Sequence, residues 1–114
     1  MNTDEMTRRI AEANDIARTA GVLTVAVTRG MAERFRRAEG LPAAQVLQRV
    51  TRHEFPDNTS SAQHDFAYVM CGGVEVWWRI LPPPGADACD PSKERVLILF
   101  MPAEYPEVER MMWR

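Results

Sequence analysis

Two adjacent glycines, Gly72 and Gly73, constrain the fold of this 114-residue chain more than any other feature. They stand between two stretches of alternating apolar residues, "DFAYVMC" before them and "VEVWWRI" after them. Because glycine readily adopts the positive φ angles of a two-residue turn, this arrangement is typical of a tight β-hairpin. The sequence therefore predicts that residues 65–71 pair with residues 74–80 as antiparallel strands.

The other elements follow from hydrophobic periodicity. The apolar runs "VLTVAVT" (22–28) and "RVLILFM" (95–101) predict two further strands. Apolar residues spaced three and four apart predict helices over 3–19, 31–40 and 42–52. Asn2 is the expected N-cap of the first helix, and Gly21 and Gly40 are expected to end the first two. The segments between, rich in Pro, Asp, Asn and Ser, are expected to be loops.

These elements predict a fold class. With 46% hydrophobic and 26% charged residues, the chain has ordinary globular composition, and its length suits one compact domain. We expect a single α+β domain over residues 1–114, with a four-stranded antiparallel sheet and two to three helices packed on one face.

The adjacent tryptophans, Trp77 and Trp78, must point to opposite faces of that sheet. Trp78 shares its face with Val74, Val76 and Ile80, which predicts that it is core. Residues 95–101 are apolar on both faces, which predicts a central strand buried on both sides. We therefore expect the second face to be covered by the C-terminal tail (residues 102–114), by a second copy of the chain or by a partner protein. On that face we expect Trp77 beside Leu97, Leu99 and Met101.

Glu75 and Arg79 flank Trp77 on the second face. An aromatic side chain in an apolar strip with a charged rim has the composition of a protein–protein hot spot. We therefore interpret Trp77, Glu75 and Arg79 as candidate partner-binding residues, with packing under the tail as the alternative.

Charge is unevenly distributed along the chain. Residues 29–53 contain six arginines and two glutamates, whereas ten carboxylates face five basic groups from residue 54 onward. Arg34, Arg36 and Arg37 are candidate partner-binding residues for this reason. The alternative function is a nucleic-acid-binding accessory protein that uses the basic patch between Arg29 and Arg52. The net charge of −2 argues against direct nucleic-acid binding, and Phe35 is the one Phe, Tyr or Trp residue among these arginines.

No residue pattern indicates catalysis. Cys71 and Cys89 have no CxxC spacing, and their spacing from His53 and His64 shows no base and orienting group around a nucleophile. A metal site needs three or four suitably spaced ligands, and His64 with Asp65 supplies two. We predict no catalytic residue, cofactor or metal, and a small enzyme is the second alternative. The absence of a long apolar run or a signal-peptide core predicts a cytoplasmic protein with no membrane partner.

Several motifs together are similar to those of an uncharacterised family, a domain of unknown function carried on bacterial plasmids and phages. They are "AND", "LTVAVTRG", "HDFAYV", "VWWRI" and "DPSKERVLILFMPAEY", which resemble the family's N-D, V-V-L-T-x-G, E-H-D-F-G, F-W-K-I-D and D-P-x-x-T-R-V-L-T-I-M-L-A-x-E-Y. This chain has "RILPPPG" where the family has K-I-D-Y-Y-D. The matching positions are Asn14, Asp15, Thr28, Gly30, His64, Asp65, Phe66 and residues 78–80 and 95–105.

The resemblance brings no activity, but it implies a mobile genetic element. Small proteins of phages and plasmids often block host defence by binding its nucleoprotein machinery, as anti-CRISPR and anti-restriction proteins do. By this analogy we expect a protein-binding inhibitor of a bacterial defence complex, acting in the host cytoplasm by occupying a protein surface.

Overall fold

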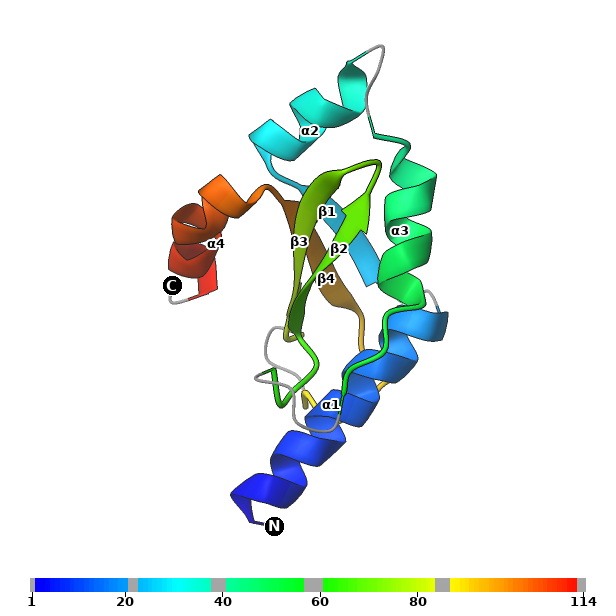
Figure 1. The fold of residues 1–114 in the computed structure, drawn as a ribbon. Helices are drawn as coiled ribbons and strands as arrows, with labels where there is room; N and C mark the ends of the chain where they lie inside the picture. The colour runs from blue at the N-terminus through cyan, green and yellow to red at the C-terminus, as the bar shows by residue number, and fades with distance from the viewer. Residues whose placement is uncertain (1, 21–22, 38–40, 57–60, 84–86, 113–114) are drawn as a thin grey trace.

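The computed structural model describes residues 2–20, 23–37, 41–56, 61–83 and 87–112, with side chains as far as residue 110. Within these ranges the α+β class and the four strands are confirmed (Figure 1). The predicted stops at Gly21 and Gly40 lie outside the described residues. The elements are α1 (Thr3–Ala20), β1 (Leu23–Val27), α2 (Arg29–Arg36), α3 (Ala43–Thr51), β2 (Phe66–Cys71), β3 (Val74–Leu81), β4 (Arg95–Phe100), the 3-10 turn η1 (Pro102–Glu104) and α4 (Tyr105–Met112).

The predicted hairpin is present between β2 and β3. Gly72 and Gly73 have φ angles of 57° and 78°, which are the left-handed values that the two-residue turn requires. Cys71 lies opposite Val74, directly across the turn. The hairpin therefore has the register that the sequence predicts.

The sheet is mixed, so the prediction of a purely antiparallel sheet was wrong. Its strand order is β1-β4-β3-β2, and β1 runs parallel to β4. The hairpin turn fixes only the relative direction of β2 and β3. Two helices and the hairpin separate β1 from β4 in the sequence, and a connection of this length allows parallel pairing.

One face of the sheet carries the main core. The core cluster on this face includes Trp78, whose side chain is 0% exposed and which was predicted to be core. It packs with residues of β4 and of the helices α2 and α3, among them Leu97, Leu99, Met31, Val46 and Val50.

The prediction of two to three helices packed on one face was wrong, because the described residues form four helices. The unpredicted fourth helix, α4, covers the other face. Val108 of α4 packs against Ile98 and Phe100. Figure 1 shows α3 and α4 on opposite sides of the sheet. Trp77 lies opposite Phe100, whereas Leu97 and Leu99 lie opposite Ile80 and Trp78 on the main core face. The prediction that Leu97, Leu99 and Met101 adjoin Trp77 was wrong, because the register of β4 against β3 cannot be known from two apolar faces.

The helix α1 begins at its predicted cap, where the backbone N–H of Glu5 donates to Asn2 Oδ1 over 2.7 Å. Ala13 and Ala17 are buried, whereas Met6 is exposed because the first turns of α1 extend beyond the sheet (Figure 1). None of the helices in the described part of the chain is both long and apolar enough to cross a membrane.

Candidate functional site

The residues that carry the family resemblance meet in pairs across the fold. Asn14 Nδ2 donates to the carbonyl of Gln63 over 2.9 Å, and Asp15 Oδ2 lies 2.9 Å from His64 Nδ1. His64 has a φ of 54°, which is uncommon for a residue with a side chain. These contacts join α1 to the segment that leads into β2, so residues of the "AND" and "HDF" segments hold these two parts of the chain together.

Arg18 extends this junction to the end of α3. Its buried guanidinium donates to the carbonyls of Val50, Thr51 and His53 over 2.7 to 3.1 Å, and it pairs with Asp15 at 2.9 Å. The last carbonyls of a helix lack partners within the helix and lie at the negative end of its dipole. Arg18 therefore fixes the C-terminal end of α3.

A second junction joins the start of α2 to the end of β4 through Glu104. Its carboxylate accepts hydrogen bonds from Thr28 Oγ1 at 2.5 Å, from the Met101 N–H at 2.9 Å and from the Gly30 N–H at 3.1 Å. A Cβ atom on Gly30 would lie 2.9 Å from this carboxylate, so a side chain there would displace the Glu104 carboxylate from its present position. Burial opposes ionisation of Glu104, but the hydrogen bonds outweigh it and lower the pKa of this carboxyl below its ordinary value.

Arg95 makes a third set of contacts between separate parts of the chain. The residue is 1% exposed, and its Nη2 donates to the carbonyls of Ala88 and Asp90. These hydrogen bonds fix the loop before β4. The motif residues described so far therefore support loops and helix ends. In the described ranges, no three His, Cys, Asp or Glu side chains are grouped so that they could hold a metal ion.

Trp77 lies in an aromatic cluster beneath the tail. Its ring centroid is 5.7 Å from that of Tyr105, at the start of α4, and 5.4 Å from that of Phe66. Its Nε1 donates to Glu75 Oε1 over 2.7 Å, and the Arg79 guanidinium lies 5.1 Å from the Phe66 ring. Trp77, Glu75 and Arg79 are thus brought together as predicted, with the tail as their neighbour.

The arginines of residues 29–53 are divided between two helices. Arg34 and Arg36 lie in α2, and Arg37 is the C-cap of that helix. Arg49 lies in α3, and Arg52 is the C-cap of α3. Arg36 donates to the carbonyl of Ala32 in its own helix. Of the basic residues in this stretch, Arg49 and Arg52 line a depression of the surface.

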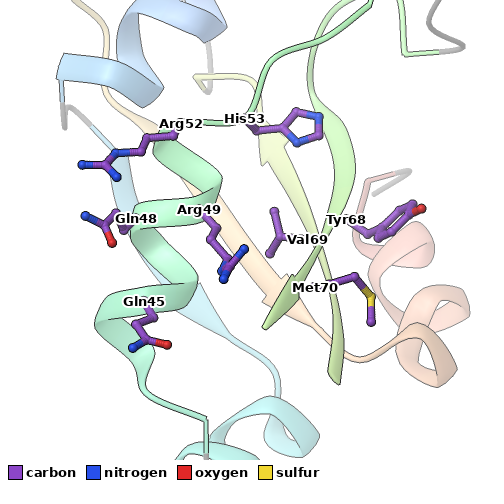
Figure 2. Close-up of a pocket in the computed structure, with 8 residues that line it drawn as sticks. All are labelled: Gln45, Gln48, Arg49, Arg52, His53, Tyr68, Val69 and Met70. Atoms are coloured by element: carbon purple, nitrogen blue, oxygen red, sulfur yellow. The ribbon is translucent and has the colours of Figure 1, made fainter. Parts of the chain in front are cut away.

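That depression adjoins a second one, and both follow the β2 edge of the sheet. They have volumes of about 640 and 610 Å³ and share His53 and Tyr68. We call the two together the α3–β2 groove, and Figure 2 shows the residues that line the first of them. The first is lined by Gln45, Gln48, Arg49, Arg52, His53, Tyr68, Val69 and Met70, and the second by His53, Phe55, Pro56, Ser61, Phe66, Ala67 and Tyr68.

One wall of the groove is a polar side of α3. Its residues, Gln45, Gln48, Arg49 and Arg52, recur at helical spacing and are exposed, whereas Val46 and Val50 turn into the core. Figure 2 shows Arg49 extending from the helix on the side where Val69 lies.

The other wall is the open edge of β2. Because Cys71 and Val74 close a two-residue hairpin, Cys71, Val69 and Ala67 exchange hydrogen bonds with β3. The N–H and C=O groups of the alternate residues, Tyr68 and Met70, therefore point away from the sheet. The Phe66 N–H follows the same outward alternation, since it donates to Ser61 Oγ at 3.2 Å. The groove thus offers unpaired strand groups to a second backbone.

The described lining of the groove is positively charged. Arg49 and Arg52 contribute two cations, and no carboxylate is present among the lining residues that the structure describes. Burial, followed by the neighbouring charge of Arg18, lowers the pKa of His53 from its ordinary value and so opposes its protonation. An acidic group is therefore favoured beside α3.

Sequence reasoning did not find this groove. The spacing of Gln45, Gln48, Arg49 and Arg52 was a visible signal for one polar side of a helix. Tyr68 and Met70, which are 54% and 47% exposed, also alternate visibly with Val69. What the sequence could not show was that α3 lies alongside β2 and that β2 is an edge strand.

Comparisons of this chain with protein-family models, with curated proteins and with solved structures find no match.

Proposed function

We propose that this chain is a protein-binding domain that acts by occupying a surface of its partner through the α3–β2 groove, without catalysis. The observation that carries this proposal is the open edge of β2 beside a groove with two arginines and exposed apolar side chains. A sheet edge with unpaired backbone groups is a template on which other chains dock.

The aromatic and basic composition of the groove supports protein binding. Tyrosine, methionine and arginine are enriched in protein interfaces, and Tyr68, Met70 and Arg49 supply one of each here. The motif residues Asp15, His64 and Glu104 are used in joints between elements, as their hydrogen bonds indicate. They therefore support the shape of the domain in this proposal and do not react with a substrate.

The target class in this proposal comes from the resemblance to a family of plasmids and phages. We propose a protein subunit of a bacterial defence complex, which the domain blocks in an anti-CRISPR-like manner. The candidate residues on the second face, Trp77, Glu75 and Arg79, remain a prediction as an additional contact surface. The packing of Trp77 against Tyr105 favours the groove as the principal site.

A capture experiment with paired charge reversals tests the proposal. The tagged chain is incubated with lysate of a bacterial host that carries its defence systems, and the bound material is identified by mass spectrometry. We expect the wild-type chain to capture one defence-complex subunit in stoichiometric amount. The Arg49→Glu/Arg52→Glu variant, which reverses the charge of the groove, should not capture it. The matched control is Arg36→Glu/Arg37→Glu, because these exposed residues at the end of α2 carry the same charge change.

Two results would contradict the proposal. Loss of capture with the α2 reversal alone would transfer the binding surface to the predicted arginine cluster at Arg34, Arg36 and Arg37. Recovery of nucleic acid without a protein would favour the nucleic-acid-binding alternative.

A further inference from the structure

We propose that the α3–β2 groove takes an extended segment of the partner in which acidic and apolar residues alternate, and that this segment pairs with β2 as a fifth strand. This inference rests on the proposed function and adds to it the chemistry of the bound segment. Three features of the groove lead to it: its backbone groups, its two walls and its charge.

The backbone groups define an extended segment. The N–H and C=O groups of Tyr68 and Met70 point outward from β2, two residues apart, which is the repeat of a paired strand. The Phe66 N–H is already donated to Ser61. A bound strand would therefore form its hydrogen bonds along the Tyr68 to Cys71 end of β2, beside Gln45, Gln48 and Arg49.

The two walls define the alternation. Successive side chains of an added strand point to opposite faces of the sheet. One set would face α3, because α3 packs on the face of Val69 through Val46 and Val50. The other set would lie beside the side chains of Tyr68 and Met70, which are exposed on the opposite face.

Charge then assigns a residue type to each set. Arg49 and Arg52 line the wall on the α3 side, so the side chains that face α3 are acidic. The side chains beside Tyr68 and Met70 are apolar, since they cover exposed apolar surface. A phosphate backbone would satisfy the arginines as well, but it has no alternating donors and acceptors to match the edge of β2.

Blocked peptides of about nine residues, long enough to span the strand, test this inference. The probes alternate Asp with Val, alternate Lys with Val, or contain the Asp and Val residues in two separate blocks. We expect the Asp–Val peptide to bind the full chain at least about tenfold more tightly than either of the others, with an affinity that falls as salt rises. On Arg49→Glu/Arg52→Glu protein, the Lys–Val peptide should become the better of the two alternating peptides.

Backbone N-methylation tests the strand pairing itself. Methylation of every second peptide nitrogen blocks one edge of the added strand, and the two possible phases block opposite edges. We expect one phase to abolish binding and the other to leave it within about twofold. Amide chemical shifts of Tyr68 and Met70 in ¹⁵N-labelled protein should move on titration with the active peptide, whereas those of Val25 and Val27 on the other edge should stay.

The outcomes separate this inference from the function on which it rests. If the Asp–Val peptide does not bind, or if both methylation phases act alike, the inference is overturned, while groove-dependent partner capture would still support the proposed function. If capture is also insensitive to Arg49→Glu/Arg52→Glu, both fail. Tighter binding of an oligothymidylate than of the Asp–Val peptide would assign the groove to nucleic acid and overturn both.

Discussion

Replacement of Glu104 with glutamine should destabilise the domain by about 2–4 kcal/mol at pH 7. Glu104 Oε1 accepts from Thr28 Oγ1 and the Met101 N–H, and Oε2 accepts from the Gly30 N–H. A hydrogen bond to a charged group contributes about 1.5–3 kcal/mol. Glutamine keeps one acceptor oxygen, so one such bond is lost, the other two lose their charge, and an amide NH₂ then faces the Gly30 N–H. Urea unfolding measures this loss, and Glu109→Gln on the exposed side of α4 is the matched control.

The same variant predicts a pH dependence with a definite sign. The pKa of Glu104 is lowered in the folded protein, so its carboxylate contributes stability that is fully present above the ordinary pKa of 4.5. This contribution disappears as pH falls through the lowered pKa. The difference in unfolding free energy between wild type and Glu104→Gln should therefore shrink toward zero in acid. A difference below about 0.5 kcal/mol at pH 7, or one that grows as pH falls, would refute this description of the junction.

Three further substitutions test the packing. Trp78→Ala should lower the unfolding free energy by about 3–5 kcal/mol, since the side chain is fully buried, and a loss under 1 kcal/mol would contradict its place in the core. Trp77→Ala should lower stability by about 1–3 kcal/mol, and its loss should be less than additive with that of Tyr105→Ala, because the rings contact each other. Additive losses would show that the tail does not cover the indole. Arg18→Met should lower the unfolding free energy by about 2–4 kcal/mol, because the carbonyls of Thr51 and His53 lose the donor that Arg18 supplies, and a neutral result in urea unfolding would refute that contact.

Local patterns predicted the four strands and the first three helices, but they did not predict α4. The glycine pair gave the hairpin and its register, and Asn2 gave the start of α1, because turn and cap chemistry depend on neighbouring residues. The core position of Trp78 followed from strand alternation once the hairpin was known. These features need no information about distant parts of the chain.

Long-range placement was not predictable in the same way. The parallel pairing of β1 with β4 depends on contacts between segments far apart in the sequence. The same is true of the register of β4 against β3, which decides which β4 side chains lie beside Trp77. The sequence places the arginines of residues 29–53 on two helices, but it does not show where these helices lie relative to each other. The α3–β2 groove depends on an edge strand meeting a helix, and neither Arg49 nor Tyr68 carries that information alone.

Amide hydrogen exchange in the captured complex tests the central claim, that the partner docks on the β2 edge. The outward N–H groups of Tyr68 and Met70 should exchange more slowly in the complex than in the free protein, by at least about tenfold, because the bound strand accepts from them. The opposite edge is an internal control. The Thr28 N–H donates to Leu99 across the sheet, so by strand alternation Val25 and Val27 point outward there, and their exchange should be unchanged. Protection at Val25 and Val27 with none at Tyr68 and Met70 would contradict the claim.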